Sequence, residues 1–124
     1  MTTPLENIEV PLAALVDLAV ECWRLERLLK MQPNNESSTT LRYSVRRLRR
    51  FVQEAGLSTL DLETQRYDPG LAVDVIGVET AEASFPPDTV IVETVSPIVT
   101  WKGQVVRYGQ VVLAPETSAS ERRE

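Results

Sequence analysis

Two ladders of apolar side chains with a helical repeat restrict the fold of this chain more than any other feature. The first ladder has spacings of 3, 4, 3 and 4 residues and consists of Leu15, Leu18, Cys22, Leu25 and Leu29. Such a spacing averages 3.5 residues, the repeat with which helices pack along a seam. Pro11 stands where a proline is tolerated in the first turn of a helix, and residues 12–31 contain no Gly or Pro. The sequence therefore predicts a helix from Leu12 to about Met31.

The second ladder predicts a second helix, from about Thr40 to Ala55. Its members step by 4, 3, 4 and 3 residues and are Leu41, Val45, Leu48, Val52 and Ala55. Gly56 follows directly, and glycine is favoured just past a helix end. The polar stretch 32–40 between the ladders is predicted to be a loop. We expect Ser37, Ser38, Thr39 or Thr40 to cap the second helix, since all four are good cap residues.

The first helix carries another apolar seam beside the first, formed by Leu12, Val16, Ala19 and Trp23. Two seams on one helix require burial on two sides, which a four-helix bundle provides. A symmetric dimer of hairpins is the simplest source of such a bundle, whereas the alternative is that the rest of the chain folds back over the second seam. We expect the dimer. Its predicted interface consists of Leu15, Leu18, Cys22, Leu25, Leu41, Val45, Leu48 and Val52.

After Gly56 the sequence becomes rich in Val, Ile and Thr, with Gly and Pro as punctuation. Five short strands are predicted, at residues 74–79, 89–94, 97–101, 104–108 and 110–114. Residues 57–65 are interpreted as a connector, and residues 81–88 and 101–104 as turns. Short strands with tight connections favour a compact, mostly antiparallel unit. The predicted fold class is α+β, with a dimerising hairpin (5–62), a small all-β domain (63–114) and a disordered tail (115–124).

Composition argues against several classes of function. The net charge is −5, which opposes binding to nucleic acid or to an anionic membrane surface. Histidine is absent and Cys22 is the only cysteine, so the commonest general base and a Cys/His metal site are both missing. We therefore expect a binding protein rather than an enzyme, with no cofactor, no metal and no membrane partner. The single cysteine fits a reducing cytoplasm.

Five arginines cluster on the predicted second helix, at positions 42, 46, 47, 49 and 50. All lie off the apolar ladder and form the polar side of an amphipathic helix. The simplest interpretation is a solvated face that pairs with Glu21, Glu26 or carboxylates of a partner. Nucleic-acid binding is disfavoured, because the chain is acidic and no row of aromatic residues accompanies the arginines. The remaining alternative is a basic contact face for another protein.

The second half of the chain resembles the GrpE proteins, the nucleotide exchange factors of DnaK-type chaperones. RYDPGLAVDVIGVE (66–79) is similar to the start of the family's β-domain, where an aromatic-Asp-Pro-x-Leu stretch precedes the first strand. VRRLRRFVQEAGLSTLDL (45–62) resembles the last bundle helix and its connector. TVSPIVTWKGQVVRYGQVVLA (94–114) is similar to the closing hairpin, with Gly103 in the turn. The resemblance covers roughly residues 12–114.

The resemblance implies a homodimer built on a four-helix bundle. Its β-domain would bind the ATPase domain of a DnaK-type chaperone and open the nucleotide cleft so that ADP leaves. Four residues match family positions on or near the surface that faces the chaperone: Val95, Gln104, Arg107 and Leu113. Trp101 is expected to join them as an exposed anchor. The alternatives for these residues are strand packing for Val95 and Leu113, a core position for Trp101 and a solvated position for Gln104 and Arg107.

Three departures separate this chain from the family pattern. About ten residues precede Leu12, so the long stalk helix of the family is expected to be missing. Pro97-Ile98-Val99 stands where a Lys-Gly-Tyr stretch is common, and Gln104 stands where an arginine commonly touches the chaperone. Loss of that arginine removes a charge-assisted contact. The alternative function is therefore a dimeric adaptor on the same scaffold that exchanges nothing.

Overall fold

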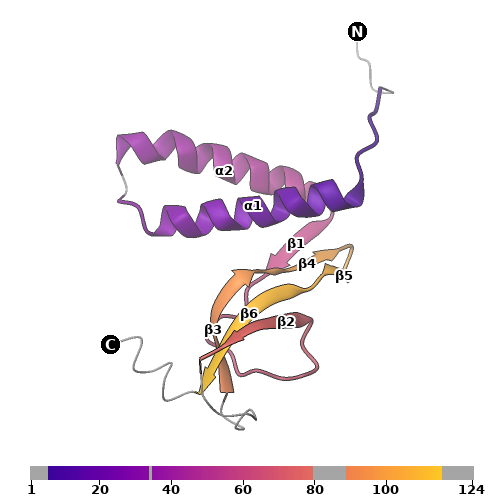
Figure 1. Cartoon of the computed structure of the whole chain (residues 1–124). Helices are drawn as coiled ribbons and strands as arrows, with labels where there is room; N and C mark the ends of the chain where they lie inside the picture. Colours follow the sequence, from indigo (N-terminus) through magenta and orange to yellow (C-terminus); the bar gives the residue numbers. More distant parts are fainter. Residues whose placement is uncertain (1–5, 34, 80–88, 116–124) are drawn as a thin grey trace.

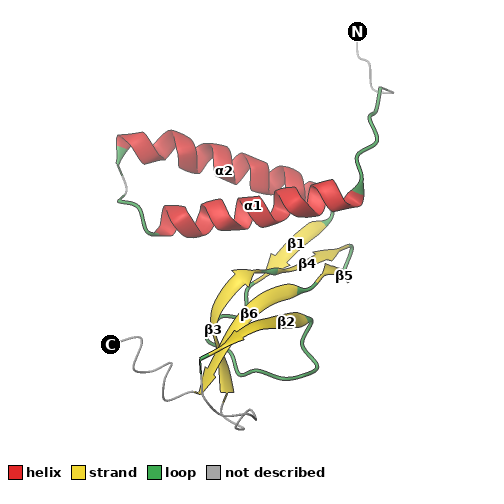
Figure 2. Cartoon of the chain, viewed as in Figure 1, coloured by secondary structure: helices red, strands yellow, loops and turns green. Residues whose placement is uncertain are grey.

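A computed structural model describes residues 6–33, 35–79 and 89–115 of the chain (Figure 1). Within these residues two helices are followed by six strands, and the helical hairpin lies on one side of the strands (Figure 2). The helices are α1 (Leu12–Lys30) and α2 (Glu36–Glu54). The strands are β1 (Leu57–Leu60), β2 (Val73–Val78), β3 (Thr89–Ser96), β4 (Ile98–Trp101), β5 (Gln104–Arg107) and β6 (Gly109–Pro115). The predicted α+β class is confirmed.

The strands form two small sheets with the orders β1-β4-β5 and β2-β6-β3. Pairing is antiparallel in the first sheet and between β3 and β6, whereas β2 runs parallel to β6. Pro97 separates β3 from β4, and the chain passes there from one sheet to the other. Because proline has no N–H to donate to a sheet, it suits such a break between strands. The turn predicted at 81–88 lies outside the described residues, and so does the tail predicted at 115–124 except for Pro115, which is the last residue of β6.

Helix α2 begins four residues earlier than the sequence predicts. Its N-cap is Asn35, whose side chain accepts a hydrogen bond of 3.0 Å from the backbone N–H of Ser38. The Ser38 hydroxyl in turn accepts from the backbone N–H of Asn35 at 3.1 Å. This reciprocal pair is a capping box. The prediction that Ser37, Ser38, Thr39 or Thr40 is the cap was therefore wrong, because the reciprocal bonds favour Asn35.

Strand β1 lies in the segment that the sequence analysis interpreted as a connector. Residues 57–60 pair with β4, and Leu57 is 0% exposed. The sequence Leu-Ser-Thr-Leu lacks Val and Ile and is short, so its strand character depends on the partner strand. The boundary predicted between residues 62 and 63 therefore assigns β1 to the helical hairpin, although β1 pairs with β4 of the β-unit.

The second apolar seam of α1 is covered by the chain itself. Val16, Ala19 and Val20 pack with Leu57 of β1 and Val99 of β4 in one buried cluster, which also includes Cys22 and Val52. Sheet β1-β4-β5 therefore packs against the helical hairpin of α1 and α2. The expectation that both seams of α1 require a second chain was wrong, because strands that pair after α2 supply the apolar surface for this seam.

A second buried cluster stabilises the other sheet and consists of Leu62, Ile91, Ile98, Val111 and Leu113. The segment that precedes β2 covers this cluster with Tyr67, Leu71 and Ala72. Tyr67 and Leu71 of the aromatic-Asp-Pro-x-Leu stretch thus act in packing. Ile98 belongs to this cluster although its neighbour Val99 belongs to the first, so the start of β4 connects the two cores.

At Gly109 the backbone of a neighbouring segment leaves little room for a side chain. A Cβ atom at this position would lie 3.0 Å from the Ser96 carbonyl oxygen and 3.1 Å from the Ile98 nitrogen. Because backbone atoms in a packed sheet cannot move aside easily, we expect Gly109→Ala to lower the free energy of unfolding by about 1–3 kcal/mol. Urea denaturation measures this change. Gly77→Ala is the control, since its Cβ would meet the nearest Val112 atom at an ordinary 3.6 Å; an equal loss in both variants would contradict the explanation.

Candidate partner-binding surfaces

Three of the predicted dimer-interface residues are buried inside the single chain. Cys22, Val45 and Val52 are 3%, 3% and 4% exposed. Burial, followed by the charges of Glu26 and Glu21, raises the pKa of the Cys22 thiol above its ordinary value. Their assignment to a surface for a second chain is therefore corrected: Cys22 and Val52 belong to the buried cluster that joins α1, α2 and β1, and Val45 is buried within the single chain. Leu15 and Leu18 are partly buried against the same cluster.

Two other members of the predicted interface remain accessible: Leu41 and Leu48 of α2 are 46% and 40% exposed. Leu25 is half-buried. Leu28 of α1, which was not among the predicted residues, is 57% exposed. Leu25, Leu28 and Leu41 line one groove of ≈ 390 Å³ at the closed end of the hairpin. Leu48 follows Leu41 by seven residues and so lies on the same stripe of α2. We call Leu25, Leu28, Leu41 and Leu48 the outer leucine face.

The hairpin of β4 and β5 carries three of the residues predicted to contact a chaperone. Trp101 and Gln104 are paired in register across the turn, where Lys102 and Gly103 have positive φ angles of 51° and 83°. The Gln104 side chain is exposed, and Val105 beside it is also exposed. Because β5 is an edge strand, this hairpin presents an accessible border of the first sheet.

Trp101 is mainly a packing residue. Its ring contacts the first buried cluster, and its Nε1–H donates a hydrogen bond of 3.0 Å to the carbonyl oxygen of Ala55, the residue after α2. Lys102 Nζ lies 4.6 Å from the ring centroid. Trp101 is half-buried, so part of the ring remains accessible. The contacts explain why a tryptophan occupies this position without any partner protein.

The other two predicted contact residues lie in the second sheet. Val95 of β3 is half-buried. Leu113 of β6 is 0% exposed and belongs to the second buried cluster. Its prediction as a chaperone contact is therefore corrected, because β6 is the central strand of its sheet and this side chain points into the core. The five predicted contact residues do not form one surface: Trp101, Gln104 and Arg107 share a hairpin, whereas Val95 and Leu113 do not.

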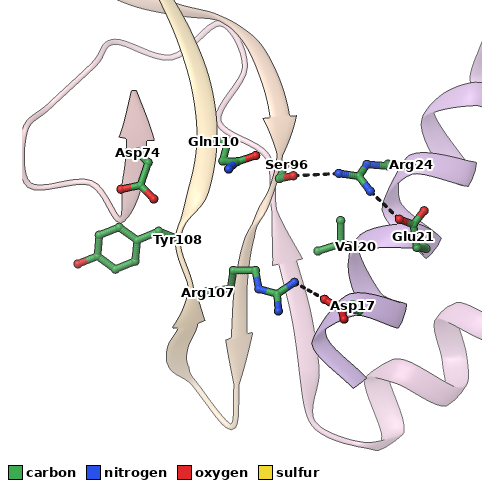
Figure 3. A pocket seen from close by; sticks show the side chains of 9 residues that line it. All are labelled: Asp17, Val20, Glu21, Arg24, Asp74, Ser96, Arg107, Tyr108 and Gln110. Atoms are coloured by element: carbon green, nitrogen blue, oxygen red, sulfur yellow. Dashed lines mark hydrogen bonds and ion pairs between the residues drawn. The ribbon is translucent and has the colours of Figure 1, made fainter. Parts of the chain in front are cut away.

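A polar cleft of ≈ 610 Å³ lies between α1 and the strands (Figure 3). Two arginines cross it in opposite directions. Arg107 of β5 donates to Asp17 Oδ1 on α1 with an Nη1–Oδ1 distance of 2.6 Å, and Arg24 of α1 donates to the Ser96 hydroxyl at 3.1 Å. Asp74 and Tyr108 lie on the wall away from the helix (Figure 3). Arg107 is therefore bonded to the chain's own helix.

Arg27 makes a third link between α1 and the β-unit. Its Nη1 donates to the carbonyl oxygen of Thr94 at 2.5 Å, and its Nη2 lies 3.5 Å from Glu63 Oε2. Each exposed ion pair of this kind contributes only about 0–1 kcal/mol, so the buried cluster fixes the arrangement and the arginines orient it. The sequence did not predict Asp17, Arg24 and Arg27 as linking residues. A signal was present, since Arg27 lies one turn beyond Trp23 on the seam that faces the strands.

The described residues were also compared with the requirements of a metal site and of a membrane-spanning helix. No group of three or more Asp, Glu, Cys or His side chains in residues 6–33, 35–79 and 89–115 is arranged to hold a metal ion. Neither α1 nor α2, the helices of the described part, has the length and apolar character needed to cross a bilayer.

Fold and surfaces together define a small α+β protein, in which a helical hairpin with an apolar outer face is fixed to two short-stranded sheets. A comparison of the sequence with models of known protein families finds no match. A comparison with curated proteins likewise finds none.

Proposed function

We propose that this chain is a GrpE-like nucleotide exchange factor, a dimer that binds the ATPase domain of a DnaK-type chaperone and promotes ADP release. The observation that carries the proposal is the presence of two separate accessible surfaces, one on the helical hairpin and one on the β-unit. The hairpin keeps an outer leucine face on the surface. The β-unit presents an exposed hairpin edge elsewhere. This arrangement suits a protein that pairs through one part and binds through another.

The proposed dimer packs two outer leucine faces into a four-helix bundle. Accessible leucines on both helices leave apolar surface in water, and a second copy removes it by the same residues on both sides. The seven-residue spacing of Leu41 and Leu48 matches the repeat of helices packed along a common seam. The β-unit does not compete for this face, since it is held against the Val16–Val20 side of α1.

The proposed chaperone contact lies on the β4–β5 hairpin, at Gln104 and the accessible part of Trp101, with Arg107 farther along the same hairpin; Val95 lies in the other sheet. A protein that opens a nucleotide cleft must bind the open state more tightly than the closed one, because only differential affinity shifts the equilibrium. To open the cleft, the β-unit must keep a fixed position relative to the helical hairpin while it binds. The buried cluster between α1 and sheet β1-β4-β5 holds the β-unit against the hairpin and supplies that fixed position, and the links through Arg24, Arg27 and Arg107 orient it.

A dimeric adaptor without exchange activity is the second candidate function. It is favoured by Gln104, which stands where the GrpE-like pattern has an arginine, and by the engagement of Arg107 with Asp17. With those charges absent or occupied, the hairpin binds a partner through neutral contacts that need not prefer an open cleft.

The two functions are distinguished by an equilibrium measurement on a DnaK-type ATPase domain from the same genome. Exchange activity requires that this chain bind the nucleotide-free domain more tightly than the ADP-bound domain. By thermodynamic reciprocity, this chain must then weaken ADP binding by the same ratio of affinities. Isothermal titration calorimetry with and without saturating ADP measures both sides. Equal affinity for the two forms would assign the adaptor function, and no binding to either would remove both candidates.

A further inference from the structure

One side of α2 carries a concentration of positive charge. The helix contains five arginines and two glutamates, an excess of three positive charges in a chain of net charge −5. Both glutamates stand at the ends of the helix, at positions 36 and 54. The arginines therefore lie together in its middle, where like charges one turn apart disfavour the helix.

Two of the five arginines have structural roles. Arg42 Nη2 donates to the carbonyl oxygens of Leu29 and Gln32 at 2.9 and 3.1 Å, and so satisfies the C-terminal end of α1. Arg49 Nη1 lies 2.7 Å from Glu26 Oε2 on α1. These contacts explain both residues as links between the helices.

Arg46, Arg47 and Arg50 have no such explanation. Within the described residues no carboxylate forms an ion pair with any of the three, and all are exposed. Tyr43 lies among them, 58% exposed, with the Arg47 guanidinium 5.8 Å from its ring centroid. Tyr43, Arg46 and Arg50 follow one another at spacings of 3 and 4 residues and so share one side of the helix. We call Tyr43, Arg46, Arg47 and Arg50 the arginine face.

We propose that the arginine face is a docking site for an acidic segment of a partner protein. Guanidinium groups bind carboxylates through paired hydrogen bonds, and Tyr and Arg are enriched where binding energy is concentrated. A shallow groove of ≈ 490 Å³ along Thr39, Arg42, Tyr43 and Arg46 gives such a segment a place to lie. This site is separate from the β4–β5 hairpin and from the outer leucine face, so the proposal does not depend on nucleotide exchange.

The observations favour an acidic protein segment over a nucleic acid. Single strands are held by successive aromatic side chains on which bases stack, and this face has one, Tyr43. The acidic remainder of the chain also repels a long phosphate backbone at every position beyond the face. A cluster of three exposed arginines on the same side of the helix as one exposed tyrosine matches a short stretch of Asp and Glu with an apolar residue among them.

The test uses a fluorescein-labelled oligoglutamate peptide and measures its anisotropy with the full chain at low salt. We expect saturable binding that weakens as salt rises. Arg46→Gln/Arg50→Gln should weaken binding by roughly tenfold or more, since two charge-assisted contacts are lost. Glutamine is a good helix former, so circular dichroism should be unchanged. The matched control is Ser58→Glu/Gln65→Glu, which lowers the net charge equally at two exposed residues outside α2. When the variants are compared at about 0.1 M salt, where charges are screened beyond about 10 Å, the control should leave affinity within about twofold.

Three results would overturn the proposal. The first is no binding of the peptide to the wild-type chain. The second is equal weakening by the arginine variant and the charge-matched control, which would indicate a response to net charge alone. The third is tighter binding of oligo(dT) than of the peptide with a steep dependence on salt, which would assign the face to nucleic acid.

Discussion

Leu48→Asp is expected to convert the proposed dimer into a folded monomer. Leu48 is 40% exposed in the single chain, so a carboxylate there remains in contact with water and α2 stays folded. In the bundle the same carboxylate is buried without a partner, and it occurs once in each copy. A cost of roughly 2–3 kcal/mol for each copy weakens the dimer by about a thousandfold or more. Analytical ultracentrifugation should show the 13.9 kDa chain alone at concentrations where the wild type sediments as two chains.

Two further variants make this result specific. Gln53→Asp places the same charge on the exposed side of α2, away from the outer leucine face, and should leave the dimer intact. Val45→Asp places it at a residue that is 3% exposed, and should unfold the chain rather than produce a folded monomer. A Leu48→Asp protein that remains dimeric would show that the outer leucine face is not the interface.

Trp101→Ala is expected to destabilise the fold strongly, although the sequence resemblance suggests an exposed anchor. The ring packs on the cluster shared by α1, α2, β1 and β4, and its N–H binds the carbonyl of Ala55. Removal of a tryptophan from such a position lowers the free energy of unfolding by about 3 kcal/mol. Urea denaturation followed by circular dichroism measures the loss.

Trp101→Phe separates packing from hydrogen bonding. Phenylalanine retains most of the apolar contact but has no N–H, so we expect a loss of about 1 kcal/mol. If Trp101→Ala leaves stability unchanged and weakens only binding to a partner protein, the assignment of Trp101 to the core is wrong.

The helices follow from the sequence because their signals are local. The 3.5-residue ladders predict α1 and α2 to within four residues at every end, and the polar positions between them predict the hairpin loop. The N-cap of α2 was mispredicted because four hydroxyl residues compete there, and the choice of Asn35 depends on a reciprocal bond with Ser38 that spacing alone does not reveal.

The strands follow less completely because pairing depends on residues far apart in the chain. The five predicted strands exist with shifted ends, whereas β1 requires β4 beside it to be recognised as a strand. The same long-range packing covers the second seam of α1, which sequence periodicity assigns equally well to a second chain or to the β-unit.

The predicted binding residues divide along the same line. Gln104, Leu41 and Leu48 are accessible, as a surface role requires. Four others are buried: Leu113, Cys22, Val45 and Val52. They were mispredicted because an apolar residue that faces the core and one that faces a partner give the same sequence pattern. Arg107 is bound by Asp17, ninety positions away in the chain, and no local signal predicts that pair.

Release of a fluorescent ADP analogue from a DnaK-type ATPase domain tests the proposed function most directly. With excess unlabelled ADP to prevent rebinding, stopped-flow fluorescence should show a release rate that rises with the concentration of this chain and then saturates. Leu48→Asp serves as a second sample that changes the oligomeric state and leaves the β-unit intact. A release rate that stays at its basal value while the two proteins form a complex would contradict nucleotide exchange.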